Sequence, residues 1–282
     1  MKIIQLNNLT FDNTSEIVKT EETVNKWMLD NAPSVDFAGS YVSAPLVDAI
    51  NLHGLGYTQS LIDELNRRAK EKMVFVCQHI QVNNINFYDN LVFTPHATSG
   101  DDYYAMPHYS VNKVESPTPF KERKYLMSFL GSFMTHPTRS SLRQILFSRM
   151  DCLVEDTGNW HFYKEEKEKK SFSGVYNQIM SESKIALCPR GTGPSTIRLW
   201  ESMAAGCVPL LVSDKLKMPI YGAAEWEDLI IRVPENDLEN IMDYIPNIDK
   251  LEEMSRKVLK SYNNFFCNSN LHKSITKVLE SV

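Results

Sequence analysis

Residues 184–214, KIALCPRGTGPSTIRLWESMAAGCVPLLVSD, decide the fold of this chain. Their pattern predicts a strand, a turn, a helix and a second strand in succession. The apolar run 184–188 is the first strand, and the two prolines and two glycines of Pro189–Pro194 require a turn. Gly206 ends the helix, and 208–212 is a second buried strand. This order is typical of a parallel α/β sheet.

The loop before the helix has the features of an anion site. Ser195 or Thr196 is predicted to cap the helix. The first turn of a helix presents backbone N–H groups that lack partners, at the positive end of the helix dipole. Arg190 and Arg198 flank this turn. We therefore expect a phosphate group here.

The spacing excludes two common phosphate motifs. Thr196 stands where a dinucleotide fingerprint needs a third glycine after Gly191 and Gly193, and no Lys follows Gly193 as a P-loop requires. Glu201 lies three residues after Arg198, on the same predicted side of the helix. A carboxylate there is suited to a ribose diol. The alternative is an ordinary surface ion pair between Arg198 and Glu201.

The string from Cys188 to Asp214 resembles the signature of exostosin-type glycosyltransferases, glycosyltransferase family 47. Leu130–Ser132, followed by His136, Pro137 and Arg139, resembles that family's strand and arginine-bearing loop. The resemblance covers roughly residues 123–240. Within this family, the chain is similar to small soluble members encoded by viruses or bacteria.

The resemblance is weaker over residues 1–115. There FVCQHIQ, Phe75–Gln81, is similar to the family's strand ending in His-Asp. His79 matches, and Ile80 stands where the Asp is usual. Asp101 and Asp102 form the only acidic pair between predicted strands in this half, with a solvated loop tip as the alternative interpretation.

Composition is typical of a globular protein. The chain has 282 residues, 43% hydrophobic and 23% charged, with a net charge of −5 and dispersed Lys and Arg, which argues against a nucleic-acid binder. The five cysteines form no C-x-x-C and are predicted to be free thiols of a reducing compartment. No segment is apolar enough for a membrane span, and a cytoplasmic location is expected, in the host if the protein is virus-encoded.

Two shorter features are weaker signals. The sequons at Asn8 and Asn13 are expected to be chance occurrences. The run Trp160–Tyr163 is expected to be an aromatic core edge, with a sugar-stacking platform as the alternative.

Alternating strands and helices predict an α/β chain of two doubly wound, Rossmann-like domains. The predicted domains are 1–118 on the acceptor side and 119–282 for the nucleotide sugar, with the last helix able to pack back on the first domain. The strand 35–39 and the helix 58–71 are among the predicted elements of the first domain. The resemblance implies that the two domains face a cleft, as in the GT-B architecture.

The resemblance implies an inverting transferase that moves a sugar from a UDP-sugar to a hydroxyl of a glycan or glycoprotein, and xylose is the sugar that we favour. No D-x-D or zinc spacing is present, so no metal or other cofactor is expected. Loop N–H groups and arginines would stabilise the leaving diphosphate instead. His79 is the expected base, with Asp101 or Asp102 as alternatives. The predicted substrate-binding residues are Gly131, Ser132, Arg139, Cys188, Pro189, Arg190, Gly191, Gly193, Ser195, Thr196, Arg198, Glu201 and Asp214.

Two other functions remain open at this point. A sugar- or nucleotide-binding module without catalysis is favoured by Ile80 in place of the family's Asp. A retaining transferase of the same architecture would differ in the anomeric configuration of its product.

Overall fold

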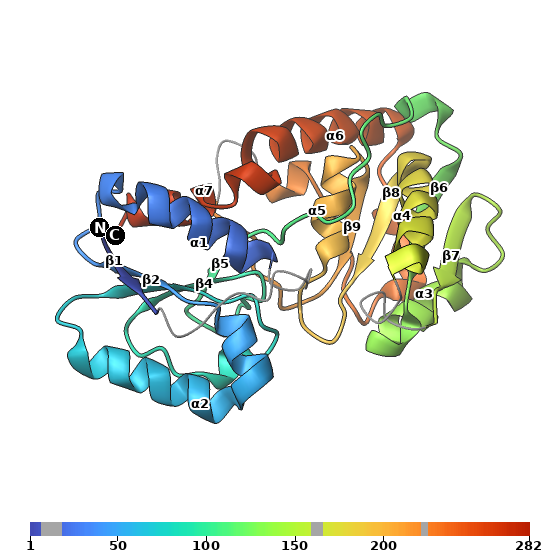
Figure 1. Ribbon diagram of the computed structural model, residues 1–282. Helices are drawn as coiled ribbons and strands as arrows, with labels where there is room; N and C mark the ends of the chain where they lie inside the picture. The colour runs from blue at the N-terminus through green and yellow to red at the C-terminus, as the bar shows by residue number, and fades with distance from the viewer. Residues whose placement is uncertain (7–18, 159–165, 221–224) are drawn as a thin grey trace. The chain divides into compact units, whose positions relative to one another are not determined.

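A computed structural model describes residues 1–6, 19–158, 166–220 and 225–282, with the side chains of 166–172 excepted. The sequons at Asn8 and Asn13 and the aromatic run 160–163 lie outside these residues. The chain divides into two compact units. The first comprises 1–109, 215–222 and 268–282, and the second comprises 110–214 and 223–267 (Figure 1).

The first unit is built on a parallel sheet with the strand order β1-β2-β3-β4-β5. Its strands are β1 (Lys2–Gln5), β2 (Ser40–Ser43), β3 (Met73–Val76), β4 (Leu91–Thr94) and β5 (Tyr104–Ala105). Its helices are α1 (Lys19–Asn31), α2 (Leu46–Arg68) and α7 (Lys273–Leu279). Successive residues of the buried strands face opposite sides, so each face of the sheet needs a helical cover.

The two faces of this sheet have separate cores. Tyr41, Val74 and Phe93 pack with α1 and α7, through residues such as Val24 and Ile275. The alternate strand residues pack on the other face with α2, and they include Val42, Phe75 and Val92. Figure 1 shows α1 and α7 on one side of these strands and α2 on the other. The sheet is therefore doubly wound, as predicted.

Two predictions for the first unit are wrong in detail. The predicted strand 35–39 is an irregular turn, and β2 begins only at Ser40. A Cβ on Gly39 would lie 2.5 Å from the Lys72 carbonyl oxygen, so the chain passes too closely there for any other residue. Helix α2 begins at Leu46 rather than at Thr58 and bends at Gly54, whose φ is +84°. Because glycines are typical of turns, the two glycines of this segment prevented the sequence from predicting its helical first half.

The second unit is a parallel sheet with the strand order β10-β9-β8-β6-β7. Its strands are β6 (Tyr125–Gly131), β7 (Cys152–Asp156), β8 (Ser183–Pro189), β9 (Val208–Val212) and β10 (Ile231–Arg232). Its helices are α3 (Pro137–Leu146), α4 (Glu166–Ser181), α5 (Ile197–Ala204) and α6 (Ile248–Ser261), with a 3-10 helix at Leu238–Tyr244. The strand, turn, helix and strand predicted for 184–214 are confirmed.

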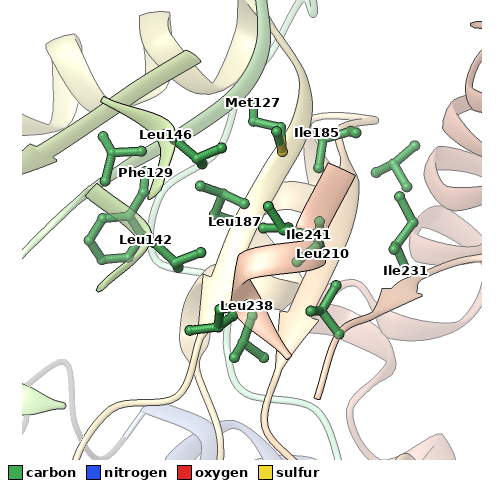
Figure 2. Close-up of a cluster of buried hydrophobic side chains, with 14 of the residues drawn as sticks. Met127, Phe129, Leu142, Leu146, Ile185, Leu187, Leu210, Ile231, Leu238 and Ile241 are labelled. Atoms are coloured by element: carbon green, nitrogen blue, oxygen red, sulfur yellow. The ribbon is translucent and has the colours of Figure 1, made fainter. Parts of the chain in front are cut away.

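One core of this unit covers one face of the sheet. Met127, Leu187 and Leu210 from adjacent strands meet Leu142 of α3 and Ile241 of the 3-10 helix, as Figure 2 shows. Strand β6 pairs with both β7 and β8, so the strand order reverses between β6 and β8. Ligands of doubly wound sheets bind beyond the carboxyl ends of the strands at such a point. Two parallel α/β units of this kind confirm the predicted GT-B fold class.

The composition of Glu115–Arg123 (ESPTPFKER), which is proline-rich and charged, predicts a linker, but this segment contains a structural anchor. Arg123 is only 5% exposed, and its guanidinium donates hydrogen bonds to four backbone carbonyls. These belong to Thr118, Ser183, Ala205 and Gly206.

Among the described helices, none is long and apolar enough to cross a bilayer.

Candidate functional site: an arginine-rich loop at the strand reversal

The loop between β8 and α5 lies at the carboxyl edge of the second sheet. Thr196 occupies the N-cap position of α5, but its hydroxyl makes no capping hydrogen bond, so that prediction for Thr196 is wrong. Gly206 ends the helical segment with φ +62°, as expected. The next amide, Cys207 N, donates to Ser202 O at 2.9 Å.

Arg139 joins the two loops that follow β6 and β8. Its Nε donates to Arg190 O at 3.0 Å, and its Nη1 donates to Ser132 O at 2.8 Å. Its Nη2 lies 3.2 Å from the position that a Cβ on Gly191 would occupy. A side chain at this position would push the guanidinium of Arg139 away by a few tenths of an ångström. Burial and neighbouring Arg198 lower the pKa of Arg139 to about 10, so its guanidinium remains charged at pH 7.

Arg198 contributes a second guanidinium at the same point. Its Nη2 donates to Leu130 O, and its Cζ lies 4.5 Å from the ring centre of Phe129 and 4.8 Å from that of Tyr176. The Cζ of Arg139 lies 5.4 Å from the same Phe129 ring. Within the described part of the chain, neither guanidinium forms an ion pair with a carboxylate. Two partly buried cations without an anion favour an anionic ligand.

Two further polar atoms beside this loop are buried without a partner among the described residues. They are Nε of Arg190 and Oγ1 of Thr135. Thr135 Oγ1 lies 3.8 Å from the Cβ position of Gly191, the glycine that Arg139 approaches. An unpartnered buried donor costs about 1–3 kcal/mol, so these atoms are suited to hydrogen bonds with a ligand.

Glu201 is a buried carboxylate with defined partners. It is 5% exposed, which contradicts the alternative of a surface pair with Arg198. Its Oε1 accepts hydrogen bonds from Asn112 N and Nδ2, both at 2.9 Å, and its Oε2 accepts one from Tyr176 Oη at 2.7 Å. Burial, with a contribution from Glu201, raises the pKa of Tyr176 well above its usual value. A carboxylate can accept about four hydrogen bonds, so Glu201 retains room for one more donor.

Two acidic side chains, Asp214 and Glu235, lie near Arg190, where the loop between β8 and α5 begins. Asp214 N donates to Glu235 Oε1 at 3.2 Å, and Glu235 N donates to Asp214 Oδ1 at 3.0 Å. Glu235 Oε1 also lies 3.7 Å from Nη1 of Arg190. Asp214 is therefore connected to the loop through the ion pair between Glu235 and Arg190. Sequence reasoning missed Glu235.

The remaining predicted donor-site residues lie on or beside the two loops. Ser132 Oγ donates to Gly158 O at 2.7 Å, and the Gly131 Cβ position lies 3.1 Å from Nη2 of Arg198. Cys188 is fully buried in β8, and burial raises the pKa of its thiol to about 12. Pro189, Gly193 and Ser195 complete this set at the end of β8 and in the loop before α5.

The first unit carries the three candidates for the base. His79 follows β3, which ends at Val76, three residues earlier than expected. The ring is half-buried, and its Nδ1 accepts a hydrogen bond from Gln81 N at 3.1 Å. Burial lowers the pKa of His79.

The acidic candidates differ from each other. Asp101 is 13% exposed and accepts hydrogen bonds from Thr98 N, Thr98 Oγ1 and Tyr103 N, and it pairs with Lys217 at 3.7 Å. The alternative of a solvated loop tip is therefore wrong for Asp101, which holds a turn together. Asp102 is exposed. Among the described residues, no three His, Cys, Asp or Glu side chains are arranged to hold a metal ion.

Comparisons with known proteins identify the family of the chain. The model of the Exostosin GT47 domain matches residues 54–248, more than half of the chain, so the chain belongs to this family. A probable glucuronosyltransferase of Oryza sativa subsp. japonica is 30% identical over 159 residues, which are 53% of this chain and 36% of that protein. Ribitol-5-phosphate xylosyltransferase 1 of Danio rerio is 30% identical over 107 residues, 37% of this chain and 24% of that protein. The chain spans about a third of the length of the first relatives that it matches.

Solved structures are similar at lower identity. The Anabaena protein HepE, in complex with UDP and glucose, has a TM-score of 0.44 and 12% identity over 100% of both chains. The lipopolysaccharide outer core galactosyltransferase WaaB, in its apo form, has a TM-score of 0.44 and 8% identity, over 100% of this chain and 99% of that chain.

Proposed function

We propose that this protein is a metal-independent, inverting glycosyltransferase that uses a UDP-sugar and a glycan hydroxyl. Family membership gives the class of enzyme. The observation that carries the proposal is the pair Arg139 and Arg198, two guanidinium groups at the strand reversal without a carboxylate partner in the described part of the chain. None of the five cysteines forms a disulfide within the part of the chain that the structure describes, which supports a reducing compartment such as the cytoplasm.

The diphosphate would bind against the loop 190–193. The unpartnered Nε of Arg190 and Oγ1 of Thr135 would donate to phosphate oxygens, and the first turn of α5 would supply N–H groups. Each hydrogen bond to a charged group contributes about 1.5–3 kcal/mol, so two or three account for a large part of the stabilisation of a leaving diphosphate. Glu201 would accept a hydrogen bond from the ribose.

A thermal-shift titration tests the proposal. UDP is expected to raise the melting temperature in the presence of EDTA, because a ligand at 100 times its Kd adds about 2.7 kcal/mol of stability. Uridine, which lacks the phosphates, is the matched control and should raise it less. No response to UDP, or a response that EDTA abolishes, would contradict the proposal.

A binding module without catalysis is the second candidate. It is favoured by the engagement of Asp101 in a turn and of His79 Nδ1 with Gln81 N, which leave neither group ready to take a proton. Release of UDP from a UDP-sugar distinguishes the two, since a transferase hydrolyses its donor slowly without an acceptor and a binding module does not.

A further inference from the structure

His136 stands at the junction between the loop after β6 and helix α3. It is the N-cap residue of α3, where its Nδ1 lies 3.0 Å from Thr138 Oγ1 and 3.4 Å from Thr138 N. The Thr138 hydroxyl can donate to an unprotonated Nδ1 or accept from a protonated one, so this nitrogen has a partner in both protonation states of the ring. Nε2 of His136 makes no hydrogen bond with any residue that the structure describes. One nitrogen therefore caps the helix, and the other is available to a ligand.

The loop that carries His136 is closed on Arg139. Arg139 N donates to His136 O at 3.2 Å, and Arg139 Nη1 donates to Ser132 O at 2.8 Å. Thr135, the residue before His136, has a buried Oγ1 without a partner in the described part of the chain. This hydroxyl lies 3.8 Å from the Cβ position of Gly191, the glycine that the Arg139 guanidinium also approaches. His136 is thus held next to two groups that are suited to an anion in the loop after β8.

The charges that act on the ring belong to the same site. Burial lowers the pKa of His136, and so do Arg190 of the loop after β8 and Arg139 of α3, whereas Glu235 after β10 raises it. The ring is therefore mainly neutral at pH 7 in the unliganded protein, since its pKa lies below the ordinary 6.5. The positive charge that opposes a proton on the ring also attracts an anion. A diphosphate, with negative charge on both phosphates, would replace repulsion of the imidazolium by attraction.

We propose that His136 is a further phosphate-binding residue of this site, and that its ring takes up a proton from solvent when a diphosphate binds. The proposal rests on the proposed function, because it assigns His136 to the same diphosphate site. The imidazolium would donate from Nδ1 to Thr138 Oγ1 and from Nε2 to a phosphate oxygen. The pKa of the ring is below 6.5 in the free protein and would be higher in the complex. The gain in affinity would therefore be full below the first pKa and lost as the pH rises through the second.

NMR follows the protonation of the ring directly. The ¹H–¹³C signal of Cε1 reports the pKa of each imidazole, and the signal that is absent from the spectrum of His136→Asn is that of His136. We expect saturating UDP to raise the pKa of His136 by about one unit or more, because a nearby opposite charge favours the charged form by that amount. A pKa that stays the same or falls when UDP binds would overturn the proposal.

The same variant separates phosphate binding from helix capping. Asn is a favourable N-cap residue, so His136→Asn keeps an acceptor for Thr138 N but cannot take a proton at neutral pH. We expect its Kd for UDP, divided by the wild-type Kd, to be larger at pH 6 than at pH 8 by about fivefold or more, because only the wild-type ring is protonated in the complex. The ratio at each pH cancels the ionisation of UDP itself.

A second histidine gives the control for this measurement. His53 is an exposed residue of the first unit, and His53→Asn should bind UDP like the wild-type protein at both pH values. A Kd ratio for His136→Asn that is the same at pH 6 and pH 8 would mean that the ring takes up no proton and is a helix cap only.

Inorganic pyrophosphate distinguishes this inference from the choice of nucleotide. It carries two phosphates without uridine or a sugar, and it should raise the pKa of His136 as UDP does. A pKa that rises with pyrophosphate, in a protein whose melting temperature does not respond to UDP, would support the role of His136 and contradict the proposed use of a UDP-sugar. A pKa that neither ligand raises would exclude His136 from the anion site.

Discussion

Positive charge at the carboxyl end of β6 has no balancing carboxylate in the described part of the chain. Arg139 and Arg198 lie over one Phe129 ring, and their hydrogen bonds to described residues go to backbone carbonyls. Stability alone does not explain this arrangement, because like charges in a partly buried place repel each other. A bound diphosphate would remove the repulsion and satisfy the buried donor of Arg190.

The guanidinium shape of Arg198 should matter as well as its charge. Arg198→Ala is expected to weaken UDP binding by at least about tenfold, and Arg198→Lys to restore it only in part, since Lys lacks the planar fork and the stacking on Phe129 and Tyr176. Calorimetric titration gives the Kd values. Arg143→Ala, at an exposed arginine of α3, is the control and should leave Kd unchanged. A lysine variant with the wild-type Kd for UDP would leave only a simple charge role for Arg198.

Glu201 is expected to serve both the fold and the nucleotide. Glu201→Ala should weaken UDP binding strongly and also cost about 2 kcal/mol or more of stability, because Asn112 and Tyr176 lose their acceptor. Tyr176→Phe removes one of these bonds while the carboxylate stays, so it should cost about 1 kcal/mol and leave Kd unchanged. If Glu201→Ala unfolds at a lower temperature but binds UDP normally, the role of Glu201 is structural only.

Glu21 should make stability depend on pH. Burial raises its pKa from 4.5 to about 8 in the folded protein. The unfolded chain therefore loses this proton first as the pH rises, and folding stability falls between pH 4.5 and 8 and then levels. We expect Glu21→Gln to reduce the fall between pH 5 and 8 by about 3 kcal/mol, measured by urea unfolding at both pH values. Equal slopes in the two proteins would show that Glu21 ionises normally.

At the scale of elements, the sequence was informative where a strand or helix carries its own pattern. In the second sheet, the predicted strands 184–188 and 208–212 lie close to the observed bounds of β8 and β9, because each is a short apolar run next to a turn. The failures lie where a contact distant in sequence decides the structure. Gly39 is required by the Lys72 carbonyl, and the linker 115–123 contains the buried Arg123.

Arg123 connects the linker to the ends of β8 and α5. Arg123→Ala is expected to cost about 3 kcal/mol or more of stability, because four hydrogen bonds from a buried guanidinium to backbone carbonyls are lost. Lys121→Ala, two residues away and exposed, should cost less than about 0.5 kcal/mol. Both are measured by chemical denaturation. Similar losses in the two variants would mean that Arg123 behaves as an ordinary linker residue.

At the scale of the whole molecule, the sequence predicted the two parallel α/β units and the family. It also placed the loop 190–193 and its arginines on the carboxyl edge. It did not predict the partners of Glu201, since Asn112 lies 89 residues away in sequence. It also missed Glu235 and Thr135, which belong to no motif and are assembled only by the fold. Side-chain partners across such separations depend on packing that no local pattern encodes.

The contacts of Asp214 and Glu235 lead to a prediction about which donor sugar the protein uses. Asp214 and Glu235 lie together beside Arg190, at the end of the loop opposite Glu201. A neutral sugar can donate hydroxyl hydrogens to such carboxylates, whereas the carboxylate of glucuronate would be repelled by them. We therefore expect the wild-type protein to release UDP from UDP-xylose faster than from UDP-glucuronate, with a kcat/KM ratio of at least about tenfold, which is near 1.4 kcal/mol. Asp214→Asn combined with Glu235→Gln should lower that ratio, while Asp228→Asn, an exposed acid of the same unit, should not. A wild-type preference for UDP-glucuronate, or a ratio that the double variant leaves unchanged, would show that these two carboxylates do not select the sugar.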